Sequence, residues 1–208
     1  KEHFETDNNR LGLDNSHVEL DWILLQSDYQ ILFYDEKQCV RHSDIRDNHV
    51  KERIQNNKYR GFRPIELKTQ MRIKAGRSYV DYIYDIFHQK TKQKKTFKNY
   101  DFKLFSSFVE MRKKILENEE LYELSKLCAG YAWKWISQKD ESLYDIIIKD
   151  EKIRWNDYSI KNWVRSEESK YTMGSLYTLR GIDLNYAGVV IGPDLYFDKN
   201  DNQIKVNK

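Results

Sequence analysis

Residues that interrupt secondary structure or form disulfide cross-links are scarce in this sequence. The 208 residues include two prolines, eight glycines and two cysteines. Because proline and glycine are so few, no stretch resembles a flexible or proline-rich linker. The chain therefore fits one compact domain that is preceded by an irregular, polar N-terminal segment. Cys39 and Cys128 lie far apart and form no CxxC motif or Cys/His cluster, which argues against a disulfide framework and against a structural zinc. A reducing, cytoplasmic location is therefore expected.

Long apolar runs and a dominant charge are also missing. No run approaches the roughly 20 apolar residues that span a bilayer, and residues 1–10 lack the apolar stretch of a signal peptide. A formal net charge of +3, from 36 basic and 33 acidic residues, argues against a polycationic nucleic-acid tail. Hydrophobic residues nevertheless make up 39% of the chain, enough for a real core. A soluble, folded protein without a membrane partner is expected. Since the chain starts at Lys1 without methionine, we interpret it as a piece of a longer protein.

Alternating strand and helix patterns are present along the chain. The apolar patterns predict strands at Tyr29–Asp35, Ile65–Arg72, Lys103–Phe105, Ala129–Trp135, Asp145–Ile148, Ser175–Thr178 and Ala187–Ile191. Helices are predicted from Ser78, from Ser107 and over Glu119–Leu127, and an exposed hairpin over Tyr196–Val206. Ala187–Ile191 is apolar on both faces, as a central parallel strand would be. Strands that alternate with helices predict an α/β layered fold.

Polar side chains follow two of these predicted strands. Asp35 and Gln38 come at the end of the first, where an acid and an amide can meet a Mg-nucleotide, because ligands bind beyond the carboxyl ends of strands in open α/β sheets. Gln70 and Arg72 lie at the end of the second strand, where a guanidinium can donate two parallel hydrogen bonds to a phosphate. The plainer alternatives are a strand that runs into a polar turn and a surface arginine in an ion pair.

A third candidate lies in a turn near the end of the chain. Thr178, Arg180, Gly181 and Asp183 stand between two predicted strands. Glycine at this position permits close backbone approach to a phosphate or a base, and Asp183 can accept a hydrogen bond from a ribose hydroxyl. The plainer alternative is a turn that needs glycine only for its dihedral angles.

Three blocks of sequence resemble a known family. The blocks are ILFYDEKQCVRHSDI (31–45), LKTQMRIKAGRSYVDYI (67–83) and YTLRGIDLNYAGVVIGPDL (177–195). They look like the later motifs of the Schlafen-type DNA/RNA helicase domain, a P-loop NTPase family related to superfamily 1 helicases. The resemblance implies a RecA-like three-layer α/β fold with a mainly parallel sheet. Residues 1–45 would be the tail of a first RecA-like domain, and residues 46–208 a second RecA-like domain.

The resemblance also implies roles for individual residues. Gln38 would occupy the motif III position that senses the γ-phosphate, and Arg72 the motif IV position that contacts it. Thr178, Gly181 and Asp183 would fall in motif V, which couples the nucleotide to the nucleic-acid strand. ATP and Mg²⁺, DNA or RNA and an N-terminal RecA-like domain would be the ligands and partners of the intact protein, with no metal site in this chain.

Departures from the family pattern limit what this chain can do alone. It contains no GxxxxGK[ST] motif, so the phosphate cradle and its lysine are absent. The Walker B acids would lie upstream of Lys1, and the closing arginine motif beyond Lys208. Tyr177 and Arg180 stand where family members usually carry His and Gln. The chain is therefore expected to be inactive as an ATPase by itself, with no tightly bound cofactor.

Two other classes of function stay open from the sequence. Asp35 followed by Glu66 and Lys68 matches the acid…ExK arrangement of Mg-dependent nucleases. A non-catalytic interaction module on a RecA-like scaffold is the other alternative. Gln89–Lys98 contains five lysines that can engage phosphates, although a solvated loop is the plainer interpretation. Tyr131, Trp133 and Trp135 are expected to pack a core rather than a base.

Overall fold

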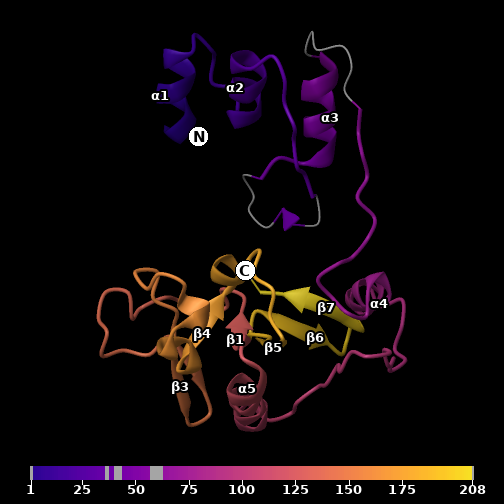
Figure 1. The fold of residues 1–208 in the computed structure, drawn as a ribbon, viewed down its shortest axis with the longest axis vertical. Helices are drawn as coiled ribbons and strands as arrows, with labels where there is room; N and C mark the ends of the chain where they lie inside the picture. Colours follow the sequence, from indigo (N-terminus) through magenta and orange to yellow (C-terminus); the bar gives the residue numbers. More distant parts are fainter. Residues whose placement is uncertain (1, 36–37, 40–43, 57–62, 208) are drawn as a thin grey trace. The chain divides into compact units, whose positions relative to one another are not determined.

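The computed structural model describes residues 2–35, 38–39, 44–56 and 63–207 (Figure 1). Their contacts divide the chain into two compact units, Lys1–Leu67 and Lys68–Lys208. Among the described residues, no helix combines the length and the apolar character needed to cross a membrane. The division into the tail of one RecA-like domain (1–45) and a second such domain (46–208) stays a prediction.

The first unit is helical. It contains α1 (Glu2–Arg10), α2 (Glu19–Gln26) and α3 (Asp47–Asn56). Asn8 of α1 is fully buried, and its side-chain oxygen accepts a 2.6 Å hydrogen bond from the Trp22 indole of α2. Arg53 of α3 forms an ion pair with Asp21 of α2. Polar contacts between side chains thus tie each neighbouring pair of helices together.

Two predicted strands are absent, and these predictions were wrong. Tyr29–Asp35 and Ile65–Arg72 form no strand, and apolar side chains in both are almost fully exposed, with Phe33 88% and Met71 88% accessible. The sheets of the described residues include no strand that pairs with either segment. A lone strand leaves its backbone N–H and C=O groups without partners, so the apolar pattern alone does not produce one.

The second unit is built on a mainly parallel five-stranded sheet in the order β2-β3-β4-β1-β5. The strands are β1 (Ser125–Ala129), β2 (Ile146–Ile148), β3 (Glu151–Trp155), β4 (Thr172–Ser175) and β5 (Tyr186–Val190). Only β2 runs antiparallel to its neighbour. This mixed α/β arrangement is compatible with a RecA-like fold, as predicted. The strands at Asp145–Ile148 and Ala187–Ile191 are confirmed, although β5 lies at the edge of the sheet rather than in its centre.

Both faces of the sheet are covered. Leu127 of β1 and its register partner Gly188 of β5 face α5 (Phe108–Tyr122), because a Cβ at position 188 would lie 2.8 Å from Ile115 of that helix. The next register pair, Cys128 and Gly174, must point to the opposite face, since side chains alternate along a strand.

On that opposite face, a Cβ at Gly174 would lie 3.0 Å from the ring of Trp163. Trp163 belongs to the short 3-10 helix η2 (Trp163–Arg165), which η3 (Glu167–Lys170) follows. The sheet therefore lies between α5 and the segment around η2. The buried core is formed by Ile115, Leu127, Ala129, Ile146, Ile153, Trp155, Met173 and Val190.

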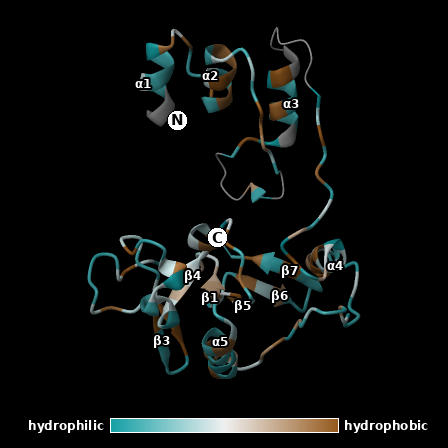
Figure 2. Ribbon diagram, in the orientation of Figure 1, coloured by the Kyte–Doolittle hydropathy of each residue, from teal (hydrophilic) through white to brown (hydrophobic). Residues whose placement is uncertain are grey.

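Local signals located two helices of this unit, α4 and α5. Helix α4 (Arg77–Phe87) begins next to Ser78, and Figure 2 shows its apolar residues. Ser107 caps α5, because its side chain accepts a hydrogen bond from the backbone N–H of Glu110. Two other predictions were wrong. Lys103–Phe105 is not a strand, and the helix predicted over Glu119–Leu127 gives way to β1 after Tyr122.

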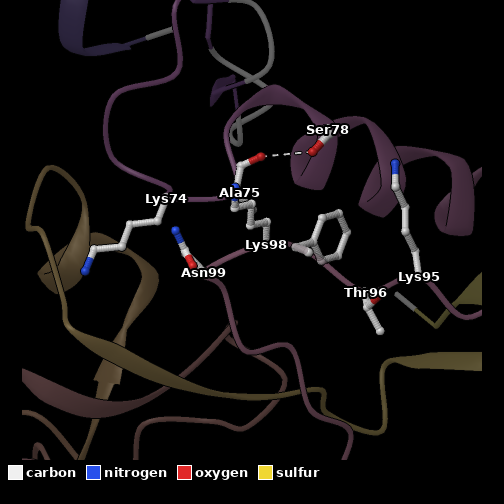
Figure 3. A pocket seen from close by; sticks show the side chains of 8 residues that line it. Lys74, Ala75, Ser78, Lys95, Thr96, Lys98 and Asn99 are labelled. Carbon is white, nitrogen blue, oxygen red and sulfur yellow. Dashed lines mark hydrogen bonds between the residues drawn. The ribbon is translucent and has the colours of Figure 1, made fainter.

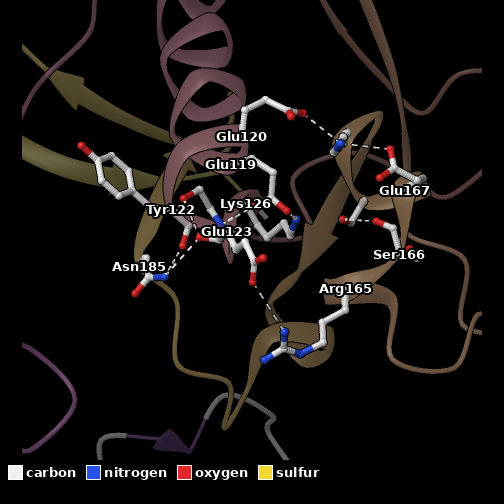
Figure 4. Close-up of polar contacts among 12 residues, drawn as sticks. Glu119, Glu120, Tyr122, Glu123, Lys126, Arg165, Ser166, Glu167 and Asn185 are labelled. Carbon is white, nitrogen blue, oxygen red and sulfur yellow. Dashed lines mark hydrogen bonds and ion pairs between the residues drawn. The ribbon is translucent and has the colours of Figure 1, made fainter.

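A polar network holds the end of α5 against the sheet (Figure 4). Glu123 and Leu124, which join α5 to β1, both adopt positive φ. The Asn185 side chain donates a 2.7 Å hydrogen bond to the carbonyl of Tyr122 and so satisfies the end of the helix. Beside it, the ammonium of Lys126 is 1% exposed and forms an ion pair with Glu119. The start of β1 is thereby fixed by charge as well as by apolar packing.

The predicted C-terminal hairpin is confirmed. It consists of β6 (Leu195–Asp198) and β7 (Gln203–Val206), which pair antiparallel. Lys205 of β7 forms ion pairs with Asp198 and Asp201, and its contact with Asp198 lowers the pKa of that carboxyl. The turn of the hairpin is thus closed by charges that face solvent.

Candidate functional site

The carboxyl ends of β1, β3, β4 and β5 meet at one edge of the sheet, because these four strands are parallel. Ligands of open α/β sheets bind beyond such an edge. Several polar or aromatic residues lie in the segments that follow these strands: Tyr131 after β1, Asn156 and Tyr158 after β3, and Thr178 after β4. With Ser175, the last residue of β4, we call these five residues the edge cluster.

Hydrogen bonds join the edge cluster into one chain of polar groups. The hydroxyls of Tyr131 and Tyr158 are 2.6 Å apart, and the Tyr158 hydroxyl is 3.2 Å from that of Ser175. The Ser175 hydroxyl is 2.9 Å from the hydroxyl of Thr178 and accepts a hydrogen bond from its backbone N–H. Loops that follow three different strands are therefore linked at their first residues.

Asn156 brings an unused donor to this edge. It is fully buried, and its side-chain oxygen accepts a 2.9 Å hydrogen bond from the backbone N–H of Ser175. Its amide nitrogen has no hydrogen-bond partner among the described residues. Because a buried polar group without a partner costs free energy, such an atom is a natural contact for a ligand or a bound water.

Tyr131 of the cluster stays protonated at neutral pH. Burial raises the pKa of Tyr131 to about 12, although its ring is still 44% exposed. The ring lies against Tyr177 and Trp155, with centroid distances of 5.6 and 5.3 Å. The edge thus offers neutral hydroxyls and aromatic faces, which suit the sugar or the base of a nucleotide better than its phosphates.

Replacing Ser175 by alanine is expected to lower the free energy of unfolding by about 1–2 kcal/mol, because a buried hydroxyl and the cap of α6 (Leu176–Leu179) are lost together. Urea unfolding followed by tryptophan fluorescence measures this change. Ser142→Ala is the matched control, since its hydroxyl is exposed and bonds only to Asp140 at the surface. Equal losses in the two variants would contradict a structural role for the Ser175 hydroxyl.

Two sequence-predicted residues that are remote in the chain meet in the second unit. The guanidinium of Arg72 lies 3.4 Å from the carboxylate of Asp183, with both side chains mainly exposed. The amide oxygen of Gln70 accepts a hydrogen bond from the backbone N–H of Arg72 and shapes the chain there. The predicted strand ending at Arg72 is absent, but Arg72 lies next to the 178–183 turn.

The 178–183 turn follows directly from the edge cluster. Thr178 belongs to the cluster, whereas Arg180, Gly181 and Asp183 are exposed on the turn after it. Gly181 has φ +85°, and a Cβ there would meet no atom within 4 Å. Glycine is therefore required for the dihedral angles and leaves the surrounding space open. The predicted strand Ser175–Thr178 is wrong, since β4 ends at Ser175 and α6 begins at Leu176.

Close packing explains the glycine of the GPDL sequence after β5. A Cβ at Gly192 would collide with the side chain of Ala132, in the loop after β1. The backbone carbonyl of Asp194 accepts a 2.7 Å hydrogen bond from Asn207, beyond the hairpin. Glycine at position 192 thus lets the loops after β1 and β5 pass in contact at the same edge of the sheet.

The other predicted residues belong to the first unit. Asp35 and Gln38 are exposed, and the Gln38 amide donates a 2.7 Å hydrogen bond to the Asp35 carboxylate. Glu36 and Lys37, which lie between them, are outside the described residues. The structure therefore joins Asp35 to Gln38 within the first unit and Arg72 to Asp183 within the second.

The described residues do not supply the parts of a nuclease site. Glu66 and Lys68 are exposed and lie outside any strand, whereas the acid…ExK arrangement needs them on a sheet. Across the described ranges, no three His, Cys, Asp or Glu side chains are grouped closely enough to hold a metal ion. What the edge offers instead is a set of hydroxyl groups and the side-chain amide of Asn156.

Sequence reasoning missed most of the edge cluster. Tyr131 was assigned to a strand over Ala129–Trp135, but β1 ends at Ala129 and places this ring at the edge. The expectation that Trp133 and Trp135 pack a core is confirmed, since both lie against the buried residues. The signal that could have found Tyr131 is Gly130, which follows the short apolar run LCA (127–129) and begins a loop.

Comparison with known proteins places this site in a family. The model of the Schlafen group 3 DNA/RNA helicase domain matches residues 9–208. An uncharacterized protein of Saccharomyces cerevisiae, YPL245W, is 30% identical over 113 residues, which are 52% of this chain and 24% of the yeast protein. The match thus spans about a quarter of that relative. No solved structure matches the chain. The family match covers nearly every residue, and the chain belongs to the Schlafen group 3 DNA/RNA helicase domain family.

Proposed function

We propose that this chain is the C-terminal portion of a helicase-like ATPase, in which Arg72 and the 178–183 turn form one half of an ATP site. The observation that supports the proposal is the 3.4 Å contact between Arg72 and Asp183, two residues that the resemblance assigns to different motifs of the family. Phosphoryl transfer is catalysed mainly by positioned charge, and an arginine beside a glycine turn is such a group.

The residues of the second unit fit one side of a bound ATP. The Arg72 guanidinium suits the γ-phosphate, and the hydroxyls of Thr178 and Tyr131 suit polar atoms of the nucleotide. The other side is not supplied by this sequence, which contains no GxxxxGK[ST] motif to cradle the phosphates. Mg²⁺ would therefore be held mainly by the phosphates and by residues of the missing part of the first RecA-like domain. Gln38, in the tail of that domain, would sense the γ-phosphate.

Nucleic acid is the proposed partner of the intact protein. The segment from Thr178 to Asp183 leads from the edge cluster to Arg72, so a nucleic-acid strand held by this turn would be coupled directly to the nucleotide. Such coupling is what translocation along DNA or RNA requires. A scaffold that binds partners without hydrolysis is the alternative, and a degraded P-loop upstream of this segment in the parent protein would favour it.

Steady-state ATP hydrolysis tests the proposal. The 208-residue chain is expected to release no phosphate above background, because its sequence lacks the GxxxxGK[ST] motif that holds the phosphates of ATP. The parent protein with its upstream region is expected to hydrolyse Mg-ATP, faster when single-stranded DNA or RNA is added. Stoichiometric hydrolysis by the 208-residue chain, or an inactive parent protein with an intact P-loop, would contradict the proposal.

A further inference from the structure

A basic pocket lies beside the start of α4, apart from the edge cluster (Figure 3). Its volume is about 450 Å³, and it is lined by Lys74, Lys95, Lys98, Ser78, Thr96 and Asn99 together with neighbouring residues. In Figure 3, Lys74 and Lys95 stand on opposite sides with Lys98 and Asn99 between them. We call this the lysine pocket. Its size suits a sugar-phosphate unit.

The segment that carries two of these lysines is fixed in place by aromatic side chains. Tyr79 of α4 packs against Tyr100 and Phe102, with ring centroids 4.7 and 5.5 Å away. Tyr82 packs against Phe97 at 5.6 Å. Burial raises the pKa of Tyr79, in keeping with a ring enclosed by its neighbours. The basic run is therefore anchored to the helix at several points.

Backbone hydrogen bonds add to this anchoring. The Tyr82 hydroxyl donates a 3.0 Å hydrogen bond to the carbonyl of Gln93 and accepts one from the backbone N–H of Lys95. A solvated loop, the plainer interpretation of the sequence, would have no such contacts. Because the backbone is already held, binding an anion here orders little further backbone.

The charge of the pocket is not neutralised within the described residues. None of Lys74, Lys95 and Lys98 lies within ion-pair distance of a carboxylate of the described residues, and Asp101 is paired with Lys103 at 2.6 Å. Asp81, on α4, is paired with Arg77. Lysines that are not paired create a local positive potential, which attracts an anion from solution.

We propose that the lysine pocket binds the phosphate backbone of a nucleic-acid strand. The choice of nucleic acid rests on the proposed function, whereas the anion-binding chemistry rests on the pocket alone. Phe97, the aromatic residue of the pocket, is packed against Tyr79 and Tyr82 and is not free to stack on a base. Binding here is therefore independent of base sequence and strongly dependent on salt.

Fluorescence anisotropy with labelled oligo(dT) and oligo(U) of about 16 nucleotides tests this proposal on the 208-residue chain. The variant Lys74→Gln/Lys95→Gln/Lys98→Gln is expected to bind both strands about tenfold more weakly. It should also reduce the slope of log affinity against log salt by about 2, because three phosphate contacts contribute roughly 0.7 each. All three lysines are exposed, so the fold should be retained, which circular dichroism checks.

A charge-matched variant controls for net charge. Lys139→Gln/Lys161→Gln/Lys199→Gln removes the same charge from three exposed lysines elsewhere in the second unit and should bind within about twofold of the wild type. Equal weakening of the two variants, or no binding by the wild type, would overturn the proposal. ATP hydrolysis by the parent protein without nucleic acid tests the proposed function separately, so the two failures are distinguishable.

Discussion

Replacing Glu119 by glutamine is expected to lower the free energy of unfolding of the second unit by about 3–5 kcal/mol. The change keeps the shape of the side chain but leaves the Lys126 ammonium, which is 1% exposed, without a carboxylate. An uncompensated charge in the interior costs several kcal/mol, far more than the loss of a surface ion pair. The other Glu119 oxygen also accepts a 2.6 Å hydrogen bond from the backbone N–H of Ser125, at the start of β1.

Urea unfolding followed by tryptophan fluorescence reports on this unit, because four of the five tryptophans lie there. Glu117→Gln is the matched control, since it breaks an exposed ion pair with Lys114 and should cost less than about 1 kcal/mol. Adding Lys126→Met to Glu119→Gln should recover most of the loss, because no buried charge then remains. A double variant no more stable than Glu119→Gln alone would show that Lys126 is not the source of the effect.

Elements with short-range signals could be predicted from the sequence. The start of α5 follows from Ser107 and Glu110, and the hairpin from the polar turn between two β-prone stretches. In each case the stabilising contacts lie within a few residues of one another, so the local sequence determines the outcome. The apolar stretch of β5 was also found, although its place at the sheet edge depends on residues far away in the chain.

Strands whose stability depends on distant partners were the main errors. Tyr29–Asp35 has the apolar pattern of a buried strand, but no described strand pairs with it. Ala129–Trp135 shows the opposite problem, because its aromatic residues suggested a strand that is really the loop after β1. An apolar pattern indicates that side chains prefer burial. It does not indicate which neighbouring strand will pair with their backbone N–H and C=O groups.

The candidate site was predictable only in part for the same reason. The resemblance assigned Arg72 and Asp183 to two of its motifs, and no local pattern implies that these two side chains lie 3.4 Å apart. The edge cluster depends on where three strands end, and an error of a few residues moved Tyr131 from the edge into the expected core. Asn156 gave no signal at all in the sequence, since its role follows from burial beside Ser175.

Arg72→Ala is expected to reduce the kcat of ATP hydrolysis by the parent protein about thousandfold, because an arginine that stabilises transferring phosphate contributes factors of this size. Arg72→Lys should recover only a small part, since an ammonium lacks the planar fork that binds two phosphate oxygens. The ion pair with Asp183 does not oppose this role. Its two side chains are 60% and 75% exposed, so the pair contributes about 1 kcal/mol or less and is readily exchanged for a triphosphate.

Two matched variants separate phosphate contact from general effects of charge. Arg77→Ala removes an exposed arginine from the start of α4, where it pairs with Asp81 at 3.8 Å, and activity should stay within about twofold. Asp183→Asn releases Arg72 from its carboxylate and should lower kcat much less than Arg72→Ala does if Arg72 acts on the nucleotide directly. A loss in Asp183→Asn as large as that in Arg72→Ala would mean that the ion pair itself is required, and that Arg72 holds the 178–183 turn rather than the γ-phosphate.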